Sequence, residues 1–161
     1  VPSALAMIRQ LSEVTGVPEA GHDLINRVHK GIGQLPSIPP MRALYMIWRK
    51  PYMAAGGDTF IHEMMKQISL TNILADRDRY PQLSSREISE LAPDLVLLST
   101  EPYPFKERHV EELQQHLPHA RFRLVDGSMF SWYGSRMEKA IHYLSTLARD
   151  LQQAAPVNSA D

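Results

Sequence analysis

The chain has 161 residues, of which 43% are hydrophobic and 22% are charged, and its formal net charge is -1. A chain of this size can bury a full hydrophobic core, and a near-zero charge without basic runs gives no support for nucleic-acid binding. The absence of cysteine excludes disulfides, thiolate metal sites and cysteine nucleophiles. No apolar stretch approaches the roughly 20 residues that a membrane-spanning helix needs.

The first 40 residues are predicted to be helical and then irregular. Residues 3–14 and 18–30 have the apolar spacing of two helices. The stripe of the first helix is expected to bury Ala4, Leu5, Ile8 and Leu11, with Val14 as a further candidate. Because residues 31–40 are rich in Gly and Pro, they are predicted to be a connector. Residues 1–40 therefore form a helical segment that precedes a different pattern.

An apolar run at Leu44–Trp48 begins that second pattern. Its lack of polar alternation is typical of a strand that is covered on both faces, as in a parallel sheet. Pro51 ends the strand because it has no N–H for the strand ladder. Asp58 is expected to cap the next helix, whose apolar residues run from Phe60 to Ile68.

The rest of the chain continues the alternation of strand and helix. Ser84 and Glu87 have the spacing of a capping box, which predicts a short helix. The later strands are expected at 95–98 and 122–125, and the later helices at 106–117 and 135–151. This order predicts an α/β fold with a mostly parallel central sheet of about four strands and helices on both faces. Residues 152–161 are expected to be a disordered tail.

Four segments of this pattern carry a family resemblance. They are IWRKPYMAAGGDTFIHEMM (Ile47–Met65), NILADRDRYPQLSSREI (Asn72–Ile88), APDLVLLSTEPYPFKERH (Ala92–His109) and VDGSMFSWYGSRM (Val125–Met137). In order and spacing they resemble the C-terminal lobe of class III periplasmic substrate-binding proteins. These are the helical-backbone receptors that deliver cobalamin, ferric siderophores or haem to ABC importers. The resemblance covers most of the chain from about Leu44 to Leu147 and implies a three-layer, Rossmann-like lobe.

The resemblance also implies a domain organisation. Residues 41–151 would be the ligand-binding lobe, and residues 1–40 the end of the backbone helix, the next helix and a Pro-rich connector. Family members have a second, N-terminal lobe, which is absent from this sequence, so we expect the chain to be one part of a receptor. The implied location is the periplasm, or the cell exterior with a membrane anchor outside this chain.

Aromatic and basic residues near predicted strand ends are the candidate ligand contacts. The aromatic candidates are Trp48, Tyr80, Trp132 and Tyr133. In open α/β sheets ligands bind beyond the carboxyl ends of the strands, and aromatic rings suit the flat face of a corrin or porphyrin. Arg49 and Arg136 could bind ligand carboxylates or phosphates through the guanidinium fork. The alternatives are loop packing for the rings and ordinary salt bridges for the arginines, such as Arg136 with Asp126.

Glu87 has two candidate roles. In a capping box its carboxylate accepts from the Ser84 N–H. By resemblance, it occupies the position at which the C-terminal lobe presents an exposed glutamate to an arginine pocket of the permease. Glu101 is a second candidate for this docking role, in which an exposed carboxylate would steer association.

The seven histidines form no metal-site pattern. Pro118 separates His116 from His119, and His62-Glu63 lacks the second histidine of a metalloprotease helix, so solvated surface histidines are expected. We expect no intrinsic metal or cofactor, because any metal would arrive inside the ligand. The sequence also contains no G-x-S-x-G elbow and no phosphate-binding loop, so an enzyme is not expected.

Three functions follow, of which the first is favoured. The chain would be the substrate-binding part of an ABC importer, capturing cobalamin, haem or a ferric siderophore between two lobes and docking on the permease. The alternatives are a small α/β enzyme without a recognisable catalytic motif, and an interaction module that self-associates through the face left by the missing lobe. A two-fold homodimer would be the default assembly.

Overall fold

The computed structural model describes residues 1–153 and divides the chain into two compact units. The helical unit contains Val1–Pro39 and the segment that begins at Tyr133, and the α/β unit contains Pro40–Trp132. The expected lobe, residues 41–151, included the last helix, which the structure groups with the N-terminal helices. No helix within residues 1–153 is long and apolar enough to cross a membrane.

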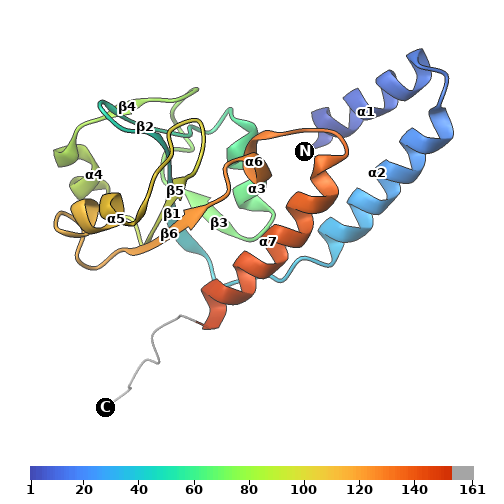
Figure 1. Cartoon of the computed structure of the whole chain (residues 1–161). Helices are drawn as coiled ribbons and strands as arrows, with labels where there is room; N and C mark the ends of the chain where they lie inside the picture. The colour runs from blue at the N-terminus through green and yellow to red at the C-terminus, as the bar shows by residue number, and fades with distance from the viewer. Residues whose placement is uncertain (154–161) are drawn as a thin grey trace. The chain divides into compact units, whose positions relative to one another are not determined.

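Three helices form the helical unit (Figure 1): α1 (Pro2–Val14), α2 (Pro18–Gly33) and α7 (Arg136–Gln153). Prolines begin α1 and α2, where a missing N–H costs nothing because the first helical N–H groups have no partner within the helix. α2 packs against α1 and α7, and Arg27 of α2 is ion-paired with Glu138 of α7 at 2.5 Å. Leu11, expected to be buried, is 54% exposed, whereas Ala4, Leu5 and Ile8 are buried.

Residues 152 and 153, which the sequence assigns to a disordered tail, belong to a helix instead. Gln152 and Gln153 are the last residues of α7, and the Gln152 side chain donates a hydrogen bond to the Ser37 carbonyl at 3.0 Å. The remainder of the predicted tail, residues 154–161, lies outside the described residues.

The α/β unit is built on a six-stranded sheet. Its strands are β1 (Met41–Trp48), β2 (Tyr52–Ala54), β3 (Leu70–Asn72), β4 (Gln82–Leu83), β5 (Leu95–Ser99) and β6 (Arg121–Val125). The order is β4-β2-β1-β5-β6, and β3 also pairs with β1. β1, β3, β5 and β6 are parallel, which confirms a mostly parallel sheet, and the short β2 and β4 add an antiparallel extension.

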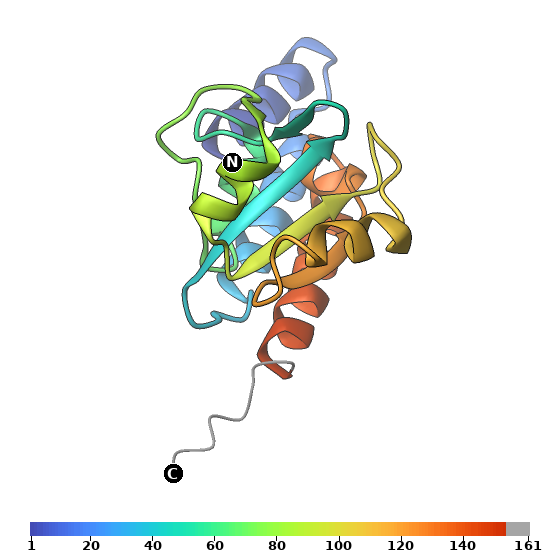
Figure 2. The ribbon, with the colours of Figure 1, turned by 90° about the vertical axis from the view of Figure 1, so that its left-hand side faces the viewer.

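Helices cover both faces of this sheet. They are α3 (Phe60–Lys66), α4 (Ser85–Leu91), α5 (Glu107–Gln114) and α6 (Ser128–Ser131). Figure 2 shows α4 and α5 in front of the sheet, and Figure 1 shows α3 and α6 on the opposite side. The α/β unit therefore has the three-layer arrangement that the sequence predicts.

β1 explains how the two faces are filled. Successive side chains of β1 point to opposite faces of the sheet. Leu44 and Met46 therefore belong to the hydrophobic core cluster that includes Ile88 of α4 and Leu113 of α5. Tyr45 points to the other face, where its ring centroid lies 5.0 Å from that of Phe130 in α6. Because both faces are packed, β1 reads as a continuous apolar run.

Two helix starts test the capping predictions. The capping box of α4 is confirmed, because the Ser84 hydroxyl accepts from the Glu87 N–H and the Glu87 carboxylate accepts from the Ser84 N–H. The predicted cap of α3 is wrong by one residue. Thr59 is the N-cap and accepts from the His62 N–H at 3.2 Å, whereas Asp58 accepts from the Arg79 N–H. Neighbouring Asp and Thr are both good caps, so the pattern alone does not separate them.

Candidate functional site

The parallel strands β1, β5 and β6 end at one edge of the sheet, which we call the carboxyl edge. It is formed by Trp48 and the loops 49–51, 100–106 and 126–132. Ligands of open α/β folds bind at this edge because the loops that follow the strands converge there. Three of the six predicted ligand contacts, Trp48, Arg49 and Trp132, lie in these segments, and the two tryptophans are exposed.

Aromatic rings pack in a row from Trp48 into the protein. Trp48 is 39% exposed, and its ring meets that of Tyr103 edge-on with centroids 5.6 Å apart. Tyr103 in turn meets Phe105, which is buried, at 4.8 Å. The exposed indole therefore rests on a packed base, and tilted and edge-on contacts of this kind favour a fixed ring orientation.

Trp132 is the second exposed indole of the carboxyl edge. It follows α6 and is 55% exposed. Its Nε1 donates a hydrogen bond to Oε1 of Glu101 at 2.9 Å, so the loop after β6 is tied to the loop after β5. Glu101, predicted as a docking residue, is half-buried and lies beside a predicted ligand contact.

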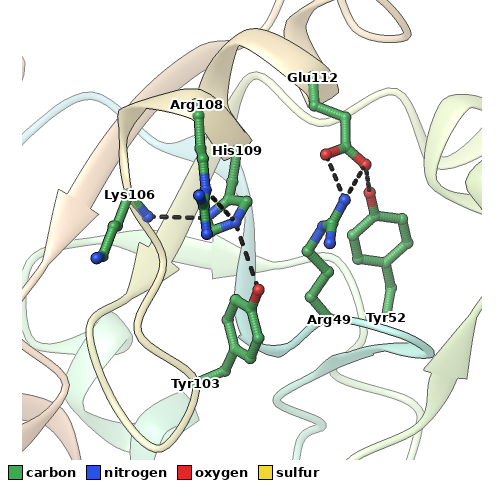
Figure 3. A network of polar contacts seen from close by, with 7 residues as sticks. All are labelled: Arg49, Tyr52, Tyr103, Lys106, Arg108, His109 and Glu112. Atoms are coloured by element: carbon green, nitrogen blue, oxygen red, sulfur yellow. Dashed lines mark hydrogen bonds and ion pairs between the residues drawn. The ribbon is translucent and has the colours of Figure 1, made fainter.

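Arg49 is held by an ion pair within the protein (Figure 3). Its Nη2 donates to Oε1 and Oε2 of Glu112 at 2.9 and 2.6 Å, and the Tyr52 hydroxyl donates to Oε1 at 3.0 Å. Burial alone would raise the pKa of the Glu112 carboxyl, but the hydrogen bonds from Arg49 and Tyr52 outweigh it and lower the pKa. Only 19% of the Arg49 side chain is exposed, so its guanidinium is largely shielded from solvent and paired within the protein.

The His109 ring packs against the Tyr103 ring, with the two centroids 5.5 Å apart. The ring is 4% exposed, Nδ1 accepts from the Lys106 N–H at 2.9 Å, and Nε2 lies 3.4 Å from the Tyr103 hydroxyl (Figure 3). Burial lowers the pKa of His109, and the positive charges of Arg108 and Arg49 lower it further. The prediction of solvated histidines is therefore wrong for His109, because its buried ring accepts from the Lys106 N–H, as Glu or Gln does at the third helical position of a capping box.

Tyr80 lies in the loop between β3 and β4 and is 41% exposed. This loop is fastened to the chain after β2, because the Gly56 N–H donates to the Arg79 carbonyl at 2.8 Å. A Cβ at Gly56 would lie 2.2 Å from the Arg77 carbonyl oxygen, so only glycine permits this approach. Tyr80 is thus presented by a well-fixed loop.

The remaining predicted contacts, Tyr133 and Arg136, belong to the helical unit. Tyr133 is 50% exposed, and Arg136 is the exposed first residue of α7.

Glu87 combines its capping role with partial exposure. Hydrogen bonds from the backbone and side chain of Ser84 lower the pKa of the Glu87 carboxyl, and Arg77 lies 3.8 Å away. The side chain is 44% exposed, so one carboxylate can cap α4 and still face solvent.

Sequence reasoning missed three residues of this region. Glu112 is 63 residues from Arg49 and carries no local sign of their pairing. His109 stands three residues after the N-cap of α5, which is a capping-box position but is rarely read as such for histidine. Tyr103 could have been predicted as a residue of this edge, since it follows the clearly apolar strand at 95–98. Within residues 1–153 no group of three His, Cys, Asp or Glu residues could hold a metal ion.

Comparison with known proteins gives a likeness of fold. No family model matches the chain, and no curated protein matches it. A candidate iron-binding, periplasmic solute-binding protein from Staphylococcus epidermidis ATCC 12228 matches with a TM-score of 0.75 and 19% identity, over 92% of this chain and 61% of that protein. The haem-binding protein RhuT from Roseiflexus sp. RS-1 matches with a TM-score of 0.72 and 20% identity, over 92% and 63%.

A third solved structure is the vitamin B12-binding protein BtuF of Vibrio cholerae, with a TM-score of 0.73 and 20% identity over 94% of this chain and 62% of that protein. This chain therefore shares its fold with part of these periplasmic proteins, which are described as binding iron, haem and vitamin B12. It spans about three-fifths of their length, because the matches cover 61%, 63% and 62% of those proteins.

Proposed function

We propose that this chain is the C-terminal lobe, with adjoining helices, of the substrate-binding protein of an ABC importer. The likeness of fold carries the proposal, because 92% of the chain matches a periplasmic solute-binding protein at a TM-score of 0.75. The solved structures that it matches are binding proteins, which also favours a binding role over an enzymatic one. The proposed location is the periplasm, or the cell exterior with an anchor elsewhere.

The proposed ligand is a bulky metal chelate: cobalamin, haem or a ferric siderophore. Similar structures are described as binding haem, vitamin B12 and iron. Trp48 and Trp132 expose ring surface at the carboxyl edge, and such surface suits the apolar face of a macrocycle. The protein itself would need no resident metal.

The mechanism is capture without chemistry. Trp48, Trp132 and Tyr80 would provide one wall of the ligand site, and a second lobe the opposite wall. Ligand contacts from Tyr133 and Arg136 stay predictions from the sequence. Arg49, whose guanidinium is ion-paired with Glu112, would be a weaker anchor for a ligand anion than an unpaired arginine. The partly exposed Glu87 would dock on a basic pocket of the permease, where a rim charge mainly steers association.

A titration followed by tryptophan fluorescence tests this function, because both tryptophans are exposed. Cyanocobalamin, haemin and a panel of ferric siderophores would be added to this chain and to a protein that also contains the N-terminal lobe. We expect saturable binding of one class by the two-lobed protein and weaker binding by this chain, which provides fewer contacts. Absence of binding to every probe would overturn the assignment of the cargo.

Self-association is a second candidate function, and one observation favours it. The large apolar side chains Met7, Leu11 and Val14, which recur along α1, are 36%, 54% and 85% exposed. A surface of this kind often marks a contact with another chain. Sedimentation velocity over a range of concentrations separates a self-associating module from a monomeric lobe.

A further inference from the structure

The exposed indole of Trp132 donates a hydrogen bond to the side chain of Glu101. Although 55% of the residue is exposed, Nε1 donates to Oε1 of Glu101 at 2.9 Å. An unrestrained ring would change rotamer in solution, and a ligand would have to immobilise it on binding. The hydrogen bond to Glu101 therefore helps to orient the exposed ring.

Glu101 is itself fixed from below by a buried serine. Ser99 is fully buried, and its hydroxyl donates to the Glu101 carbonyl and accepts from the Glu101 N–H at 3.4 Å. Tyr45 is also fully buried, and its hydroxyl donates to Oγ of Ser99 at 3.3 Å. The position of Glu101 thus depends on β1 and β5 and not on a loose loop.

Gly127 fixes Glu101 from the other side. A Cβ at Gly127 would lie 2.6 Å from Cγ and 2.7 Å from the carbonyl oxygen of Glu101, so the loop after β6 lies directly against this side chain. The Gly127 N–H also donates to Oγ1 of Thr100 at 3.2 Å. The two loops that carry Glu101 and Trp132 therefore approach each other closely before their side chains meet.

We propose that Glu101 is a positioning and specificity-determining residue of the ligand site: it orients Trp132 and provides a hydrogen-bond acceptor beside the ring. The proposal rests on the proposed function. A carboxylate can accept about four hydrogen bonds, and Trp132 uses one of them, so a ligand N–H or O–H can use another. A ligand carboxylate at the same place meets like charge.

The ligand chemistry follows from this pair. Arg49 is paired with Glu112, so its charge does not compensate Glu101. An apolar ring face next to an anionic acceptor favours a chelate that carries amides or hydroxyls over one that carries free carboxylates at this contact. This assignment puts Glu101 on the ligand side of the molecule, in place of the predicted docking role.

The positioning role is tested without any ligand. Trp48→Phe leaves Trp132 as the only tryptophan, since the chain contains two. In this background we expect Glu101→Leu to increase the fast component of the fluorescence anisotropy decay and to shift the emission maximum. Glu101→Gln keeps an acceptor oxygen and should restore the slow decay. Glu107→Leu, which removes an exposed glutamate of α5, is the control.

A Trp132 anisotropy decay that Glu101→Leu leaves unchanged would overturn the positioning role. Far-UV circular dichroism shows whether each variant keeps its fold. If Glu101→Leu loses the fold, the Trp132 emission maximum of Glu101→Gln is compared with that of the parent chain. A shift is expected, because the indole N–H then donates to a neutral acceptor instead of a charged one.

The specificity role is tested with haemin and haemin dimethyl ester, which differ only in their carboxylates. We expect the unaltered chain to prefer the ester, and Glu101→Gln to reduce the ratio of the two Kd values by about two- to five-fold, the size typical of a partly exposed charge interaction. An unchanged ratio would overturn the specificity role. If no porphyrin, cyanocobalamin or ferric siderophore binds, the assignment of the cargo and the specificity role fail together, whereas the ligand-free anisotropy still decides the positioning role.

Discussion

Arg49 and Glu112 lie 63 residues apart in the sequence and meet at 2.6 Å. At the scale of single residues, the sequence predicts which side chains stand near strand ends but not which of them are already paired. The aromatic candidates Trp48 and Trp132 are exposed at the carboxyl edge, since their positions follow from local pattern. The state of Arg49 depends on a helix that only the folded chain brings near it.

His109 leads to a prediction on pH dependence. Its folded-state pKa lies below the unfolded value of about 6.5, because burial and nearby cations oppose protonation. The unfolded chain therefore takes up the proton first, and the stability contributed by the neutral ring is lost as the pH falls below about 6.5. We expect the free energy of unfolding, measured with urea, to fall less between pH 7.5 and 5.5 for His109→Gln than for the unaltered chain.

Glutamine suits this test because it can keep the acceptor of the capping box without titrating. Burial also lowers the pKa of His62. The quantity to compare is therefore the change in unfolding free energy of the variant minus that of the parent chain, in which the contribution of His62 cancels. His119→Gln makes the same substitution at an exposed position and is the matched comparison. Equal slopes for His109→Gln and the parent chain would contradict the assignment.

At the scale of helices and strands, patterns that are complete within a short segment were predicted well. β5 (Leu95–Ser99) is buried along its whole length, as its apolar run indicates. β2 and β4 were missed because they have three and two residues and exist only through pairing with neighbouring strands. α6 is four residues long and has no periodicity to detect.

The capping box of α4 gives a prediction at this scale. Ser84→Ala removes the hydroxyl that accepts from the Glu87 N–H, which should lower the free energy of unfolding by about 1 kcal/mol. Ser85→Ala is the matched control, because Ser85 is the first helical residue and not the cap. Urea denaturation measures both, and equal effects of the two substitutions would show that the cap contributes nothing specific.

At the scale of the whole molecule, the sequence pattern predicted the α/β unit better than the division into units. α7 follows the last strand in the alternation, and only packing against α2 assigns it to the helical unit. The burial of α1 was also misjudged, since its apolar stripe is wider than the face that packs on α2. Leu11 and Val14 remain 54% and 85% exposed for this reason.

These two residues give a prediction on assembly. We expect Leu11→Gln with Val14→Gln to change the free energy of unfolding by less than about 0.5 kcal/mol, because exposed side chains contribute little to folding. The doubly substituted chain should also sediment as a monomer at concentrations where the parent chain associates. Leu5→Gln, at a buried position, is the control and should destabilise the protein. Identical sedimentation of the double variant and an associating parent chain would exclude this face of α1 as the contact.

The central place of β1 has a consequence for how the chain folds during synthesis. β1 is hydrogen-bonded to β2, β3 and β5, and its partner residues Ala43 and Leu95 are 52 residues apart along the chain. Pairing of strands that lie far apart in the sequence is slow compared with the formation of local contacts. A ribosome that has made β1 must therefore add the next 50 or so residues before the strand can be covered on its second edge. During that interval the apolar run of β1 depends on β2, β3 or a chaperone for protection from aggregation.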